Sequence, residues 1–168
     1  MKIEIFPLEK VVIDGTALFL GMKQAEAEQI IGKGQFIRDR YYYFNSELAI
    51  SYDKDDNVSF IEFLGGIDGQ LKPTIFSISA FETNADEVFE LLKQHDDDIT
   101  DAEQGFCYSF LNISVGIYRE ATRENVTEMI EEAESFGNPM SEEEIEYEMK
   151  KASHWATIGI GVKDYYRY

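Results

Sequence analysis

Two acidic stretches contain the residue types that most often bind metal ions. "DKDDNV" at 53–58 begins like a calcium-binding EF-hand loop, with Asp, Asp and Asn at its first, third and fifth positions. Such a loop needs glycine at position six and glutamate at position twelve, whereas this chain has Val58 and Leu64 there. The stretch also lies between two predicted strands rather than two helices. We therefore interpret it as a polar hairpin turn.

The second stretch places His95 directly before Asp96, Asp97 and Asp98. Imidazole and carboxylate groups bind metals when ligands from several segments converge, and the only other histidine, His154, is remote in sequence. We interpret the three aspartates as a solvated loop that follows a helix. His95 suits the negative C-terminal end of that helix. The sequence thus predicts neither a metal nor a cofactor.

Cys107 and the glutamates at 131–148 are the remaining candidates for catalysis. Cys107 is the only cysteine, so no internal disulfide can form, which fits a reducing compartment. It lies in an alternating stretch, where a packed thiol is more common than a nucleophile. Acid–base catalysis needs a desolvated carboxyl, whereas these glutamates fall on polar helix faces. We therefore predict a protein that is not an enzyme.

Apolar residues that alternate predict strands, and apolar residues three or four apart predict helices. In the first half this pattern gives a helix near 23–31 and strands at 2–6, 10–13, 41–44, 47–52 and 58–65. In the second half it gives a helix near 84–94, strands at 74–82, 106–110 and 113–118, and the last strands within 154–166. Gly159 and Gly161 fall on one face of the last strand region, which favours close packing there.

The order helix, strand, strand, strand thus occurs twice. Phe44 and Tyr52 are spaced as Phe110 and Tyr118 are, which strengthens the match. The sequence predicts an α+β fold of two similar halves, 1–70 and 71–168, each a helix packed on an antiparallel sheet. Two thin halves bury more apolar surface together than apart, so we expect one compact unit.

The second half carries an insertion at 122–152 that the first half lacks. Its pattern predicts two helices. One spans 125–136, and the other begins at Ser141 with a capping box to Glu144. Apolar stripes run along both helices, and most of the remaining residues are glutamate. The sequence predicts an acidic two-helix insertion.

The formal net charge is −18, and the acids are clustered. Glu82–Glu103 holds nine acids against one lysine, and Thr122–Lys151 holds ten glutamates against three basic residues. Such a protein repels nucleic acid and anionic membranes and attracts cationic partners. No stretch has the apolar length of a membrane span, and "MKIEIFPLEK" lacks the apolar core of a signal peptide. We expect a cytoplasmic protein.

The second half resembles immunity proteins of bacterial polymorphic toxin systems. The resemblance covers roughly residues 75–168 and rests on "NADEVFELLKQH", "YSFLNISVGIYRE", the acidic helices and "SHWATIGIGVKDYY". The first half is similar to the helix-then-strands repeat of β-lactamase-inhibitor-like domains, in "LGMKQAEAEQIIGKG" and "ELAISYDKDDNVSFIEF". Both resemblances imply binding, and neither supplies a catalytic or ligand residue. They imply a small inhibitor that occludes a toxin, which is often a basic nuclease.

The leading prediction is therefore a non-enzymatic inhibitor of a cognate basic toxin. One alternative is a small enzyme or ligand-binding domain with a cleft between the halves, and another is an acidic nucleic-acid mimic that regulates a nucleic-acid-binding protein. Tyrosines are enriched at interfaces, so part of the C-terminal tyrosine run is included in the predicted partner surface. The predicted partner-binding residues are Asp96, Asp97, Asp98, Glu131, Glu132, Glu134, Glu142, Glu143, Glu146, Tyr165 and Tyr166.

Overall fold

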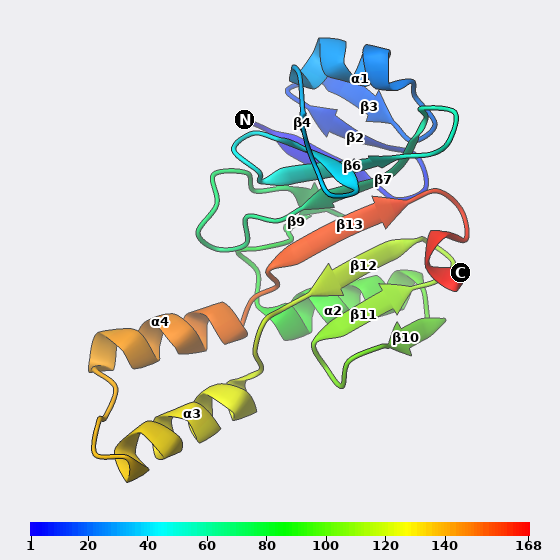
Figure 1. Cartoon of the computed structure of the whole chain (residues 1–168). Helices are drawn as coiled ribbons and strands as arrows, with labels where there is room; N and C mark the ends of the chain where they lie inside the picture. The colour runs from blue at the N-terminus through cyan, green and yellow to red at the C-terminus, as the bar shows by residue number, and fades with distance from the viewer.

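A computed structural model describes all 168 residues as an α+β fold with four α-helices and two sheets (Figure 1). The strands are β1 (Ile3–Phe6), β2 (Lys10–Ile13), β3 (Thr16–Phe19), β4 (Gln35–Ile37), β5 (Arg40–Tyr43), β6 (Leu48–Tyr52), β7 (Val58–Phe63), β8 (Thr74–Ile75), β9 (Ile78–Ser79), β10 (Ile99–Asp101), β11 (Cys107–Phe110), β12 (Val115–Tyr118) and β13 (Thr157–Gly161). The helices are α1 (Gln24–Ile31), α2 (Ala85–His95), α3 (Arg123–Ser135) and α4 (Glu142–Ala152), and a short 3-10 helix, η1, spans Tyr165–Arg167. None of the helices is long and apolar enough to cross a bilayer.

The larger sheet is antiparallel throughout, in the order β10-β11-β12-β13-β7-β6-β5-β4. At its centre β13 pairs with β7, which sets Ile158 opposite Phe63 and Ile160 opposite Ile61. These four side chains belong to the hydrophobic core. Because successive side chains of a strand point to opposite faces, Glu62 of β7 points to the other face of the sheet.

The smaller sheet has the order β3-β2-β1-β8-β9, and β8 runs parallel to β1. The single strand predicted at 74–82 is wrong, because the chain turns at Phe76 and Ser77, where φ is 48° and 70°. The turn separates β8 from β9, which then pair with each other. The two arms of a hairpin can face the same core, so an alternating pattern does not require one continuous strand.

Helix α2 has a buried side made of Ala85, Val88 and Leu92. Asn84 caps its first turn by accepting a hydrogen bond from the Asp86 N–H. The helices predicted near 23–31 and 84–94 are both present. Of the last strands predicted within 154–166, only β13 forms, and the chain then enters η1.

Strands from both predicted halves share the two sheets. In the smaller sheet β1 pairs with β8, and in the larger sheet β7 pairs with β13. A single cluster of 25 buried residues joins side chains from both sheets and from α2. The resemblance between residues 1–70 and 71–168 stays a prediction.

Helices α3 and α4 lie between β12 and β13 and form a hairpin that extends from one end of the larger sheet (Figure 1). We call residues 122–152 the acidic arm. The predicted capping box at Ser141 and Glu144 is present, and Thr122 forms a second one with Asn125. These caps satisfy backbone N–H groups that the first turn of each helix leaves free.

Candidate functional site

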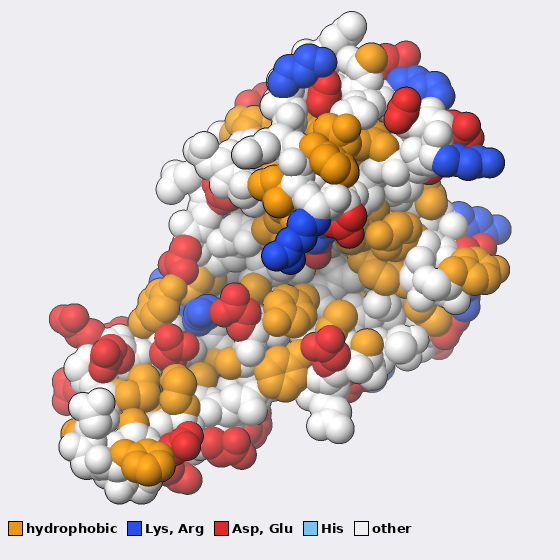
Figure 2. All heavy atoms as spheres, viewed as in Figure 1, with side chains coloured by type: hydrophobic (Ala, Val, Ile, Leu, Met, Phe, Trp, Pro, Cys, Tyr) orange, Lys and Arg blue, Asp and Glu red, His pale blue; other side chains and the backbone are white.

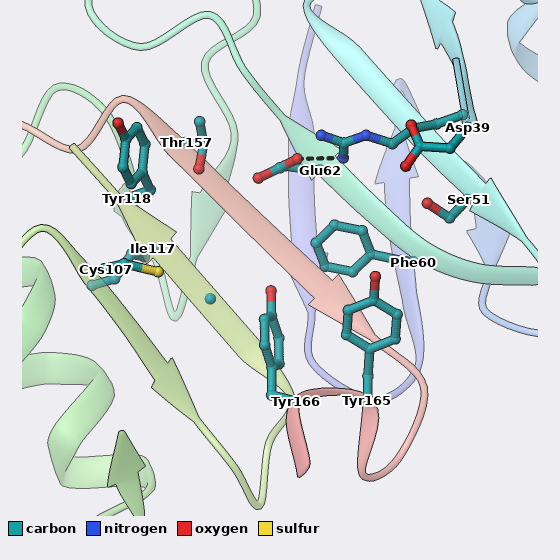
Figure 3. Close-up of a pocket in the computed structure, with 12 residues that line it drawn as sticks. Asp39, Ser51, Phe60, Glu62, Cys107, Ile117, Tyr118, Thr157, Tyr165 and Tyr166 are labelled. Carbon is teal, nitrogen blue, oxygen red and sulfur yellow. Dashed lines mark hydrogen bonds and ion pairs between the residues drawn. The ribbon is translucent and has the colours of Figure 1, made fainter. Parts of the chain in front are cut away.

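A pocket of about 370 Å³ opens on the face of the larger sheet opposite Ile61 and Phe63 (Figure 3). It crosses the pairing of β7 with β13, so strands on either side of that pairing contribute residues to its lining. We call it the central pocket. Its lining comprises Asp39, Arg40, Ser51, Phe60, Glu62, Cys107, Gly116, Ile117, Tyr118, Thr157, Tyr165 and Tyr166.

Tyr165 and Tyr166 close one end of the central pocket (Figure 3). The Tyr165 ring stacks on Phe60 with ring centroids 4.5 Å apart and an interplanar angle of 1°, and the Tyr166 ring stands at 83° to Phe60. Both predicted partner-binding tyrosines thus pack on the chain's own sheet, although 37% of Tyr165 remains exposed.

Glycines make room for these rings, as predicted for the last strand region. A Cβ placed on Gly159 would lie 2.5 Å from Phe60 Cζ and 3.3 Å from Tyr166 Oη. Ordinary contacts of a Cβ are longer than about 3.4 Å, so a larger residue would displace the rings. A Cβ on Gly161 would likewise meet Tyr165, and a Cβ on Gly116 would meet Tyr166. The sequence predicted the close packing, and the tyrosines that provide it were assigned instead to a partner surface.

Burial acts on two protonated groups of the central pocket, Cys107 and Tyr166. Burial raises the pKa of Cys107, and the charges of Glu103, Glu62 and Asp101 raise it further, so the thiol stays protonated. Burial likewise raises the pKa of Tyr166 well above its usual value. Arg40 donates a hydrogen bond to Glu62. The pocket can therefore bind a ligand through hydroxyl groups and an ion pair.

Asp96 is buried, with 5% of its surface exposed, so the prediction of a solvated loop is wrong at this residue. Its Oδ2 accepts hydrogen bonds from the N–H groups of Asn112 at 2.7 Å and Ile113 at 3.0 Å. Its Oδ1 accepts from Asp98 N–H at 3.0 Å and from Asn112 Nδ2 at 2.9 Å. Asp96 therefore ties the end of α2 to the turn between β11 and β12.

Burial on its own would raise the pKa of Asp96. The hydrogen bonds from Ile113, Asp98 and Asn112 outweigh it and hold the pKa below its usual value. Sequence reasoning missed this role. The tight turn at Asn112 was a possible signal. A turn between two strands leaves backbone N–H groups that need an acceptor, and a carboxylate can supply it.

Asp97 and Asp98 lie away from the acidic arm. The first residue of α2, Ala85, donates its N–H to the Ser153 carbonyl at the base of the arm. The aspartates follow the last residue of this 11-residue helix, which is about 16 Å long. Asp98 accepts a hydrogen bond from Arg167 at 2.9 Å, next to the C-terminal tyrosines. The predicted partner-binding residues thus fall into two separate regions.

The predicted glutamates of the acidic arm are all exposed, and none of them forms an ion pair. They are Glu131, Glu132, Glu134, Glu142, Glu143 and Glu146. Figure 2 shows acidic side chains around the outside of the arm. The one ion pair that involves the arm joins Lys151 to Glu120, which lies just outside it. The arm is therefore a dense cluster of uncompensated negative charge.

The apolar stripes of the arm are only partly buried. Val126 and Ala152, at its base, are buried, and no residue between them is. A groove of about 390 Å³ opens between the two helices near their connecting turn, and we call it the arm groove. Its lining comprises Met129, Ala133, Asn138, Pro139, Met140, Glu144, Tyr147 and Glu148. The stripes were predicted as helix-packing surfaces, so the sequence did not reveal the groove.

The two histidines have local partners. The His95 ring stacks on Phe76 with centroids 3.6 Å apart, and His154 Nδ1 lies 2.5 Å from the Lys150 carbonyl oxygen. No three His, Cys, Asp or Glu side chains are grouped as a metal site requires.

Comparisons with protein-family models, with curated proteins and with solved structures find no match for this chain.

Proposed function

We propose that this protein is a non-enzymatic, protein-binding inhibitor, an immunity protein that neutralises a cognate basic toxin. One observation carries the proposal: the acidic arm holds ten glutamates, extends from the larger sheet, and pairs with a single acid outside itself through Lys151 (Figure 1). Like charges held close together destabilise a folded chain. An external cationic partner accounts for their concentration on one hairpin.

A charged projection of this kind steers a partner of opposite sign. Long-range attraction raises association rates by 10- to 1,000-fold and falls with ionic strength. Speed matters for a protein that must occlude a toxin before the toxin acts. The resemblance of residues 75–168 to immunity proteins, which includes the acidic helices, is consistent with this use.

We also propose that the two halves derive from one duplicated unit. Tyr43 pairs with Leu48 across a four-residue connection, and Phe110 pairs with Val115 across another. In the next pairing, Ile50 lies opposite Ile61 and Ile117 lies opposite Ile158. In this correspondence Phe110 matches Tyr43, one residue away from the Phe44 that the sequence pattern suggested. The acidic arm then replaces the short turn between β6 and β7.

The central pocket favours a second candidate function, the binding of a small ligand. It crosses the junction between the halves, where a cleft was expected, and Ser51, Thr157 and Tyr166 bring hydroxyl groups to it.

The nucleic-acid-mimic alternative also relies on the acidic arm but differs in the partner that the arm binds. Binding to a nucleic-acid-binding protein that has no toxic activity would favour it over the immunity proposal.

The immunity proposal is tested by co-expression. The gene next to this one is examined for a long secreted protein with a variable C-terminal domain, and that domain is expressed in a bacterial host with and without this chain. We expect the domain alone to stop growth and the pair to grow normally. Growth arrest that persists at equal expression of both proteins contradicts the proposal, and a metabolic operon around the gene favours the small-ligand function.

A further inference from the structure

The arm groove combines apolar and polar lining residues, and the chain leaves its apolar side chains partly exposed. Met129 is 38% exposed and Tyr147 is 43% exposed, one on each helix of the hairpin. Ala133, four residues after Met129, adds a small side chain to the same wall. Figure 2 shows apolar side chains grouped on the visible face of the arm, with acidic ones beside them. Two helices without a third element leave such a seam open to solvent.

The rim of the arm groove is negative. Glu144 and Glu148 line it at a spacing of four residues along α4, so both lie on the same side of that helix. Neither residue forms an ion pair. Glu144 also accepts the Ser141 N–H at 2.8 Å, which fixes its position at the groove. An occupant must therefore combine an apolar surface with flanking positive charge.

We propose that the arm groove receives a basic amphipathic helix of the partner protein. A groove between two helices of a hairpin runs along them, and a third helix packs there by the ridge-and-groove rules of helical bundles. Apolar residues of the incoming helix contact Met129, Ala133 and Tyr147, and its lysines or arginines face Glu144 and Glu148. This mode of recognition is the helix-in-groove mode. A second copy of this chain or an anionic membrane would instead bring like charges together.

This inference rests on the proposed function and specifies how the partner binds. It predicts that association buries the exposed seam, so that the arm gains an apolar core when the partner is present. The acidic residues outside the groove then set the encounter rate. The residues inside it set how long the complex lasts, because interface contacts act mainly on dissociation.

The test uses the full chain and two synthetic peptides of leucine and lysine, each of about 18 residues, or five helical turns. One peptide has its leucines along a single helical face, and the other has the same composition in an order that spreads them around the helix. Titration calorimetry at physiological salt compares their affinities. We expect the amphipathic peptide to bind about tenfold more tightly or better, a difference of ~1.4 kcal/mol.

Variants locate the binding site. Met129→Gln and Ala133→Gln place polar groups in the groove without a change in charge, and each should remove most of the preference for the amphipathic peptide. Phe136→Gln is the matched control, because Phe136 is 80% exposed on the same arm but does not line the groove. Circular dichroism and the fluorescence of Trp155 verify that each variant folds. Loss of the preference in Phe136→Gln to the same extent would overturn the assignment to the groove.

A second pair of variants separates the groove from diffuse charge. Glu144→Gln with Glu148→Gln removes the rim charges, and Gln can still complete the capping box. Glu142→Gln with Glu146→Gln removes the same charge from the same helix outside the groove lining. We expect the first pair to weaken binding of the amphipathic peptide several-fold more than the second. Equal binding of both peptides, or equal effects of both pairs, overturns the inference and leaves the co-expression test of the proposed function unaffected.

Discussion

At the scale of single residues, Asp96 shows how a position suggestive of a surface function can be structural. Four donors surround its carboxylate, and they join the end of α2 to the turn at Asn112 and Ile113. The backbone N–H groups of that turn would be left without partners if the carboxylate were removed. A buried donor without an acceptor costs about 1–3 kcal/mol.

We therefore expect Asp96→Asn to lower the free energy of unfolding by about 2 kcal/mol, because the amide has one acceptor oxygen and its NH₂ group faces N–H donors. Asp97→Asn is the matched control. Asp97 is exposed and forms no hydrogen bond through its side chain, so its replacement should change stability by less than about 0.5 kcal/mol. Urea denaturation followed by Trp155 fluorescence measures both. Equal stability of the two variants would show that Asp96 does not hold the turn.

The same residue sets a pH dependence with a defined sign. The folded-state pKa of Asp96 lies below its usual value, so its stabilising effect is fully present above the unfolded-state pKa of about 3.9. That contribution is lost as the pH falls through the lower folded-state pKa. The stability of the native protein should therefore drop more steeply below about pH 4 than that of Asp96→Asn. Parallel curves for the two proteins would contradict this assignment.

At the scale of elements, helices α2 and α4 have the same length and similar N-terminal caps but differ in how much of their surface is buried. Each has 11 residues, a side-chain N-cap and acids in its first turn. Helix α2 buries Ala85, Val88 and Leu92, whereas α4 buries Ala152 alone. Short helices are marginal in water without tertiary contacts. Their stability should therefore differ within one molecule.

Native-state hydrogen exchange tests this difference. We expect amides of α4 between Ile145 and Met149 to exchange through local opening, at rates at least about a hundredfold above those of α2 near Val88. A bound partner that fills the arm groove should slow exchange in α4 and leave α2 unchanged. Equal protection of the two helices in the free protein would mean that the arm is held by more than its base and the hydrogen bond that the Tyr147 hydroxyl donates to Asp68.

The helices and most of the longer strands were predictable. The short strands β3, β4 and β10 were not predicted, and neither were the environments of the elements. The capping box at Ser141 acts locally, so the sequence placed the start of α4 correctly, whereas the helix predicted to begin at 125 begins at Arg123. The strand predicted at 74–82 was wrong because a turn at Phe76–Ser77 depends on the core that both arms meet. The coverage of Tyr165 and the exposure of Met129 depend on elements far away in the chain. A sequence pattern identifies an apolar stripe but not what packs against it.

At the scale of the whole molecule, the two predicted binding regions lie at different places. The central pocket and the C-terminal tyrosines lie on the larger sheet, and the arm with its glutamates extends beyond the end of that sheet (Figure 1). The glutamates of the arm are exposed and lie outside the shared core, so they can be changed without altering it. Charge-reversal variants of the arm therefore isolate its role from that of the pocket.

Once co-expression identifies a toxin domain that this chain neutralises, the association rate of the two proteins tests whether the arm steers the encounter. Glu131→Lys, Glu142→Lys and Glu146→Lys together reverse charge on the arm. Glu26→Lys, Asp55→Lys and Glu90→Lys are the matched control and make the same change at exposed sites elsewhere. Stopped-flow measurements at low and high salt compare each triple variant with the native chain.

We expect the arm variant to associate at least about tenfold more slowly at low salt, to lose most of the salt dependence, and to unfold at an unchanged or slightly higher temperature. The control variant should keep most of the native rate. An association rate of the arm variant equal to that of the native chain at low salt would contradict the account, and the contact surface would then be sought at the central pocket and Tyr165.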